Sequence, residues 1–140
     1  MTDGLDQNLT QVALDLLAAD TSLTVYDGIV PNNSTRPYVL VYTTLSRPSE
    51  DPDNASDGRT RVWVARWICH CVGDNAKAAR GIAQRVRTQL LDVHPTVTGF
   101  SAESVGSIRM DGDELPPARD ESTGTPVMDA VVTYRLRANS

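Results

Sequence analysis

The sequence predicts an α+β fold, in which a mixed, mostly antiparallel sheet of four to five strands has two helices packed on one face. Two stretches, residues 5–19 and 75–91, repeat their apolar residues with the period of an amphipathic helix. Other stretches alternate with the period of a strand. One of these, residues 60–72, is apolar on both faces, as a central strand is. The predicted order is therefore α-β-β-β-α-β-β.

The first helix is predicted over residues 5–19. Its apolar side chains recur three and four residues apart, at Leu5, Leu9, Val12, Ala13, Leu16 and Leu17. Asp3 is placed to cap it, because a carboxylate accepts hydrogen bonds from the free amides of a first turn. A short strand, residues 23–26, follows and is closed by the turn residues Asp27 and Gly28.

The second strand is predicted over residues 37–45. Tyr38, Leu40, Tyr42 and Thr44 share one face, and Val39, Val41, Thr43 and Leu45 share the other. Pro37 opens the strand, where its missing N–H costs the ladder little. Residues 46–58 are polar throughout and are expected to form a long loop to the next strand.

The strand at residues 60–72 is expected at the centre of the sheet. One face carries Trp63, Ala65, Trp67, Cys69 and Cys71. The other carries Val62, Val64, Ile68 and Val72, with Arg66 and His70 among them. Two helices cover only one face of such a sheet, so we expect another chain to cover part of the second face.

The second helix, residues 75–91, follows the turn Gly73-Asp74, with Asp74 as its expected cap. Its apolar stripe is Ala79, Ile82, Ala83, Val86 and Leu90, and the opposite face carries Lys77, Arg80, Gln84 and Arg87. Strands are then predicted over residues 104–110 and 126–137, separated by a polar loop at 111–124. The core face of the last strand is Met128, Ala130, Val132, Tyr134 and Leu136.

The length of the chain and its net charge limit the functions that are possible. The 140 residues predict one domain, 1–140, and the net charge of −5 argues against a general nucleic-acid binder. Seven basic residues lie between Arg59 and Arg87, whereas acids gather in the loops at 46–58 and 111–124. Such a pattern can complement itself between copies. Arg135 and Arg137 are a weaker indication of contact with nucleic acid, since aromatics are not interleaved with them.

Targeting and membrane signals are not recognisable in the sequence. The first ten residues contain no basic segment and no apolar run, and no stretch approaches the length of a membrane span. We therefore expect the protein to be made in the cytoplasm and to need no membrane.

Cys69-His70-Cys71 is the most site-like motif. On a strand the two cysteines share a face while His70 points away, and a structural zinc site needs four ligands. Two buried thiols are therefore favoured over a metal site. His70 and His94 are the only histidines available as a catalytic base, and neither lies in a nucleophile motif. We expect no catalysis and no cofactor.

Five segments together carry a family resemblance. They read LTQVALDLLAAD, LTVYDGIVP, RPYVLVYTTLS, RTRVWVARWICHCVG and DNAKAARGIAQRVRTQLL. In this order they resemble the tail-terminator (tail-completion) proteins of long-tailed bacteriophages, over residues 9–136. The resemblance implies a homohexameric ring at the head-proximal end of the tail tube, which stops tube polymerisation and docks the head connector. Such a ring would reside in the virion, with DNA passing through its lumen without sequence-specific binding.

The contacts between subunits, or with partners, are predicted to use opposite charges. The residues concerned are Lys77, Arg80, Arg87, Arg119, Asp51, Asp53, Asp113 and Glu114. Expected partners are further copies of the chain, the tail-tube protein and the head–tail connector or stopper. Three alternatives remain: a head-completion or stopper protein, a small metal-binding or enzymatic domain using Cys69, His70 and Cys71, and a binding module for a host protein.

Overall fold

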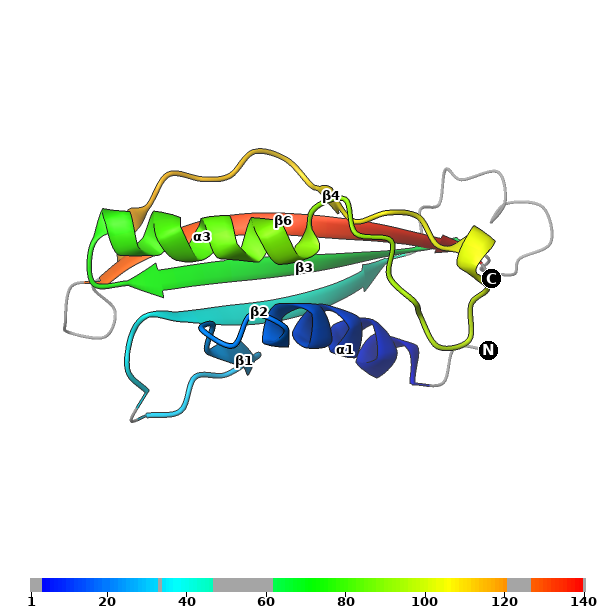
Figure 1. Ribbon diagram of the computed structural model, residues 1–140, viewed down its shortest axis with the longest axis horizontal. Coiled ribbons are helices and arrows are strands. Elements are labelled where there is room, and N and C mark those ends of the chain that lie inside the picture. Colours follow the sequence, from blue (N-terminus) through cyan, green and yellow to red (C-terminus); the bar gives the residue numbers. More distant parts are fainter. Residues whose placement is uncertain (1–3, 33, 47–61, 121–126, 140) are drawn as a thin grey trace.

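A computed structural model of the protein describes residues 4–32, 34–46, 62–120 and 127–139 (Figure 1). Two α-helices, a 3-10 turn and six strands make up this part of the chain. In chain order they are α1 (Leu5–Ala18), β1 (Val25–Asp27), β2 (Tyr38–Ser46), β3 (Val62–Gly73), α3 (Ala76–Leu90), η1 (Ala102–Ser104), β4 (Arg109–Met110), β5 (Ala118–Asp120) and β6 (Val127–Asn139). The α+β prediction is confirmed, with one strand more than expected.

The strands form one mixed sheet in the order β1-β2-β3-β6-β4, with β5 also paired to β6. The β1–β2 pair is parallel and every other pair is antiparallel. The long strands β3 and β6 lie at the centre, as the two apolar faces of β3 predict. The segment from β3 through α3 to β4 is a crossover that skips the position taken by β6.

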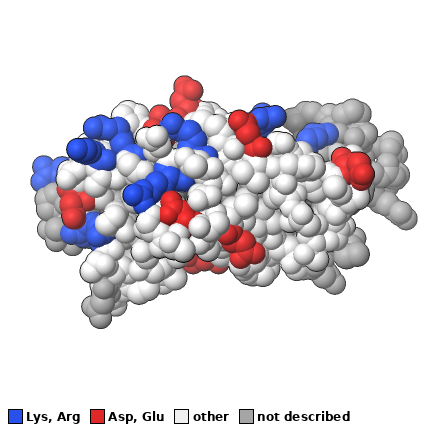
Figure 2. All heavy atoms as spheres, in the orientation of Figure 1, with Lys and Arg blue, Asp and Glu red and all other residues white. Residues whose placement is uncertain are grey.

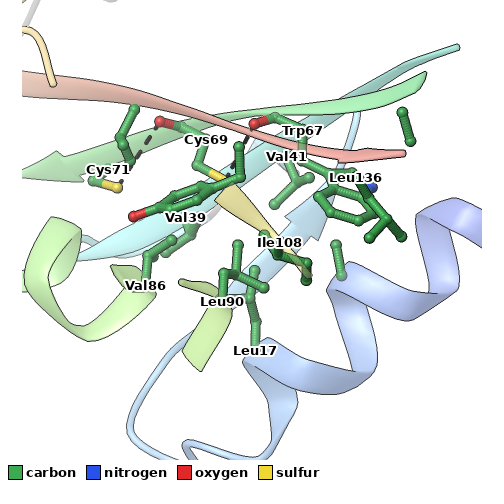
Figure 3. Packing of buried hydrophobic residues seen from close by; sticks show 14 of the residues in the cluster. Leu17, Val39, Val41, Trp67, Cys69, Cys71, Val86, Leu90, Ile108 and Leu136 are labelled. Carbon is green, nitrogen blue, oxygen red and sulfur yellow. Dashed lines mark hydrogen bonds between the residues drawn. The ribbon is translucent and has the colours of Figure 1, made fainter. Parts of the chain in front are cut away.

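Both helices pack on the same face of the sheet. Helix α3 lies over β3 and β6, and α1 lies over β1, β2 and the edge of β3 (Figure 1). The face of β3 that carries Trp67 points toward them, and Trp67 is fully buried there (Figure 3). The predicted core face of β6 points the same way, and its Tyr134 is also fully buried. The indole N–H of Trp67 also donates to the carbonyl oxygen of Leu9 at 3.1 Å, which fixes α1 to the central strand.

Two predicted elements differ from the structure. The stretch 104–110 is a strand only at Arg109–Met110, with a single bridge from Val105 to Ala138 before it. The predicted loop 111–124 instead begins along the edge of β6, where the amide of Asp111 donates to Thr133 and that of Leu115 to Val131. It then forms β5. Pro116 and Pro117 have no N–H to give, and they explain why the pairing is interrupted.

The cap of the second helix is one residue later than predicted. The side chain of Asn75, not Asp74, accepts a hydrogen bond from the amide of Ala78 at 2.8 Å. Asp74 instead pairs with Arg36 at 2.6 Å. Both residue types cap helices well, so the sequence did not separate them. The expected cap of α1, Asp3, lies outside the described residues, and Gly4 stands at the N-cap.

The first acidic loop leaves the sheet at one end, and the second returns to the sheet at the other end. Ser46 pairs with Val64 near the end of the sheet where β6 finishes. Asp120 pairs with Val127, where β6 starts. Most of the predicted loop 46–58 lies outside the described residues.

Candidate assembly interfaces

No helix in the described part of the chain covers the face of the sheet opposite α1 and α3. This face is lined by Leu40, Tyr42 and Thr44 from β2, by Arg66, Ile68 and His70 from β3, and by Asp129, Val131, Thr133, Arg135 and Arg137 from β6. It mixes half-buried apolar side chains, such as Leu40, Ile68 and Val131, with polar and charged ones, and Tyr42 at 41% is one of the three exposed large hydrophobic residues among those described. We call this surface the open face.

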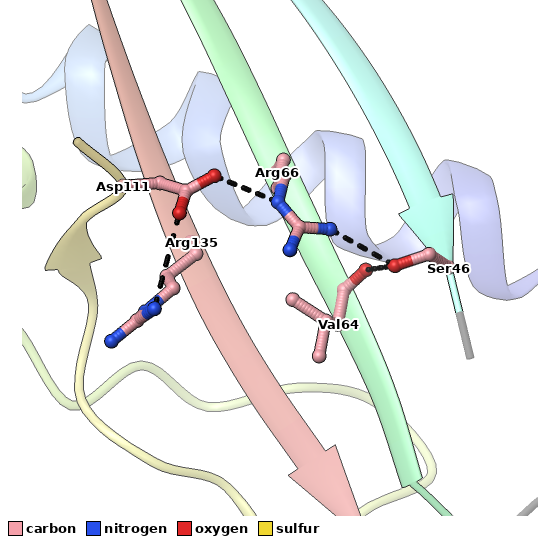
Figure 4. Close-up of polar contacts among 5 residues, drawn as sticks. All are labelled: Ser46, Val64, Arg66, Asp111 and Arg135. Carbon is pink, nitrogen blue, oxygen red and sulfur yellow. Dashed lines mark hydrogen bonds and ion pairs between the residues drawn. The ribbon is translucent and has the colours of Figure 1, made fainter. Parts of the chain in front are cut away.

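A charged cluster lies at one end of the open face (Figure 4). Arg66 and Arg135 pair directly across β3 and β6, so their side chains stand next to each other. Asp111 lies between them, with its carboxylate 2.7 Å from Nε of Arg66 and 3.9 Å from Nη1 of Arg135. Arg66 also donates to the hydroxyl of Ser46 at 3.0 Å. The acid therefore relieves the repulsion between two adjacent arginines.

His70 occupies the middle of the same face. Its Nδ1 lies 2.8 Å from a carboxylate oxygen of Asp129, and its ring meets that of Tyr42 edge-on with 5.6 Å between centroids. The histidine is thus held by β2 and β6 on either side of its own strand. This arrangement orients the ring within the surface of the open face.

The cysteines of the Cys69-His70-Cys71 motif point the other way, as their alternation predicts. Both are free thiols, and both are fully buried against the helices. Burial raises the pKa of the Cys69 thiol to about 12 and raises that of Cys71 as well. Within the described residues, no group of three or more His, Cys, Asp or Glu is placed to hold a metal ion.

Helix α3 presents a basic surface on the opposite side of the molecule. It carries Lys77, Arg80, Arg85 and Arg87 and has no acidic residue. Figure 2 shows these blue side chains gathered over the end of the molecule where α3 lies. Arg85 reaches back to the hydroxyl of Ser22, whereas Lys77 and Arg80 are exposed.

Arg87 and Glu114, predicted at an interface, are brought together within the chain. Nη2 of Arg87 lies 2.7 Å from a carboxylate oxygen of Glu114. This hydrogen bond is the main cause that raises the pKa of Arg87. The Tyr134 hydroxyl lies beside the guanidinium, and burial raises the pKa of that tyrosine. The pair therefore ties the segment before β5 to α3, and each side chain has its charge partner in its own chain.

The other predicted interface residues are spread along the surface. Asp51 and Asp53 lie outside the described residues. Asp113 is exposed beside Glu114, and Arg119 stands on β5, opposite Met128 and so on the helix side of the sheet. Sequence reasoning missed the cluster of Arg66, Asp111 and Arg135. The two arginines lie side by side because of the register between β3 and β6. The alternation of residues within a single strand gives no information about that register.

A groove borders the edge of β2 beyond its pairing with β1. Its volume is about 690 Å³, and Leu5, Thr10, Thr43, Leu45 and Trp63 are among its lining residues. The hydroxyl of Thr43 is buried there without a hydrogen-bond partner among the described residues. The groove is open and shallow, unlike the enclosed pockets that hold small molecules. In addition, the described helices include none long and apolar enough to span a membrane.

The fold has counterparts among solved structures, although the sequence does not identify a family. No protein-family model matches the chain, and no curated protein matches it. A chain from the virion of a native gene transfer agent (GTA) particle superposes with a TM-score of 0.68 at 14% identity, over 97% of this chain and 98% of that one. A second solved structure, of a protein without a descriptive name, gives a TM-score of 0.57 at 14% identity, over 100% and 96% of the two chains. These likenesses establish a shared fold over the full length.

Proposed function

We propose that this protein is a structural component of a virion. It forms a ring at the head-proximal end of a phage tail tube, ends tube polymerisation there and offers a docking face to the head connector. The observation that carries the proposal is the likeness to the gene transfer agent virion chain, which extends over nearly all of both chains.

The character of the surface supports an assembly role. The open face combines half-buried apolar side chains with polar and charged ones, a composition suited to contact with protein. The described residues that titrate abnormally are buried thiols, a buried phenol and side chains in local hydrogen bonds, and they do not converge on a pocket. We therefore assign no enzymatic step and no cofactor to the protein.

The partners follow from the proposed position. A hexameric ring at the end of a tube contacts neighbouring copies at its sides, the tail-tube protein on one rim and the connector or stopper on the other. DNA passes through its lumen without sequence-specific contacts. The protein is made in the host cytoplasm and ends in the virion, at the joint between head and tail.

Two experiments test the proposal. In electron micrographs of virions carrying a labelled copy of the protein, the label is expected only at the head–tail joint; label elsewhere on the particle contradicts the proposal. In a deletion strain, a terminator is expected to leave tubes of uncontrolled length. Tails of normal length that fail to join heads would instead identify a head-completion or stopper protein. The gene order gives a further check, since a terminator gene is expected immediately before the tail-tube gene.

A further inference from the structure

The two helices divide the covered side of the molecule into an acidic half and a basic half. Residues 4–32, which include α1 and β1, contain four acids and neither lysine nor arginine: Asp6, Asp15, Asp20 and Asp27. Helix α3 contains four basic residues and no acid. Because α1 lies over β1 and β2 while α3 lies over β3 and β6, these opposite charges lie on the same face of the sheet but toward opposite edges.

Neither edge of the sheet is paired with a further strand among the described residues. Strand β1 forms one edge, and the segment containing β4 and β5 forms the other. An edge strand exposes backbone groups that can pair with another chain. Each edge also carries an exposed aliphatic side chain, Ile29 at 76% just after β1 and Leu115 at 57% just before β5. These two and Tyr42 are the large hydrophobic residues most exposed in the described part of the chain.

The features of the two edges lie at similar heights along the strands. Asp27 stands in the row that runs through Val41, Cys69 and Val132. The amide of Leu115 bonds to Val131, which belongs to the next row. If a second copy lies beside the first with its strands in the same orientation, the β1 edge of one copy thus lies near the β4–β5 edge of the other.

The exposed charges are placed to meet at such a contact. Arg80 lies two helical turns before Arg87 and hence on the same side of α3, the side from which Arg87 reaches Glu114 on the edge segment. Lys77 and Arg80 are exposed and have no ion-pair partner among the described residues. The carboxylate of Asp27 on the other edge likewise has no ion-pair partner among the described residues. Charges of opposite sign are thus available on the two edges for contact with another copy.

We propose that copies of this chain associate head to tail through their sheet edges, with the α1–β1 edge of one copy against the α3–β5 edge of the next. Two different surfaces of one chain then form each contact, which is the heterologous arrangement that closes into a ring or continues as a filament. The occupant is a second copy because the chain itself carries both complementary edges. The inference rests on the proposed function, for which it supplies the lateral contact.

Directed cross-linking tests this arrangement. An Ile29→Cys chain and a tagged Leu115→Cys chain are mixed and oxidised, and products joining residue 29 to residue 115 are expected to dominate over those joining like positions. The native thiols do not compete, because both are fully buried. Ala102→Cys in place of Leu115→Cys is the control, since Ala102 is exposed in η1. A predominance of like-with-like products, or an equal yield with Ala102→Cys, overturns the proposal.

Charge reversal in the same mixture tests the electrostatic part. Asp27→Lys in the Ile29→Cys chain is expected to lower the yield several-fold. The same change placed in the Leu115→Cys chain is expected to leave the yield unchanged, because that edge is not used in the product. Adding Lys77→Glu and Arg80→Glu to the Leu115→Cys chain is expected to restore the yield lost to the first reversal. Failure of this rescue contradicts the charge pairing.

The outcome is separable from that of the proposed function. If labelled protein lies at the head–tail joint but residues 29 and 115 do not cross-link preferentially, the function stands and the edge contact is wrong. If they cross-link while the label lies elsewhere, the edge contact stands and the position in the virion is wrong.

Discussion

The two faces of the sheet are built from the same strands yet have opposite characters. On the helix-covered face, β3 and β6 place Trp67, Cys69 and Tyr134 in full burial. On the open face the residues next to them include Arg66 and His70, which are only half-buried. The contrast separates two tasks. Burial of a large aromatic stabilises by several kcal/mol, whereas a partly exposed ion pair contributes about 0–1 kcal/mol, so the first face determines the fold and the second is available for contact.

The buried thiols give the largest expected difference between the faces. With the pKa of Cys69 raised to about 12 from an ordinary value of about 8.5, the thiolate fraction at neutral pH falls about three-thousand-fold. Alkylation of the folded protein with iodoacetamide at pH 8 is expected to be slower by at least that factor than alkylation in denaturant. The linkage has a definite sign: above about pH 8.5 the unfolded thiols ionise and the folded ones do not, so the free energy of unfolding falls as pH rises. Rapid labelling of the native protein would contradict the burial.

Removal of the central indole is the next largest effect. Trp67→Ala is expected to lower the free energy of unfolding by about 3–5 kcal/mol, because it leaves a cavity and removes the hydrogen bond to Leu9. Chemical denaturation followed by circular dichroism measures it. Tyr42→Ala on the open face is the matched control, and an equal loss from both variants would show that the open face is packed as firmly as the core.

The joint between β3 and α3 allows a sharper comparison of two glycines. A Cβ on Gly73 would lie 2.8 Å from both the Ala78 Cβ and the Ala79 amide nitrogen, so Gly73→Ala is expected to cost about 1–3 kcal/mol. Gly81 meets nothing within 4 Å, and Gly81→Ala is expected to stabilise the exposed helix by about 0.8–1 kcal/mol. Thermal unfolding of the two variants checks both signs. If Gly73→Ala were neutral, the strand and helix would not approach as closely as described.

The smallest effect is expected on the open face. Arg66→Met removes ion pairing with a carboxylate that is itself partly exposed, and the expected loss of stability is about 0–1 kcal/mol. A double-mutant cycle with Asp111→Asn measures the coupling, and 0.5 M salt is expected to reduce it. A coupling above about 2 kcal/mol would indicate that this face contributes to the fold and is not only a contact surface.

The sequence predicted the elements whose residues alternate strongly. The two faces of β3, the core face of β6 and the apolar stripe of α3 follow from periodicity alone, because burial selects every second residue in a strand and every third or fourth in a helix. The sequence did not predict which strands pair or in which register. Strand β5 has only three residues and exists because β6 offers an edge, and the Arg66–Asp111–Arg135 cluster depends on a register that joins distant segments. Charge complementarity was anticipated, but Arg87 and Glu114 meet within one chain because the edge segment passes beside α3.

The segment at residues 111–115 has one further property. Its first acid, Asp111, binds Arg66 on the open face, and three residues later Glu114 binds Arg87 on the helix side. The segment therefore passes around the edge of the sheet and makes an ion pair on each of its two surfaces. Only four residues of chain connect the charged cluster of the open face to helix α3.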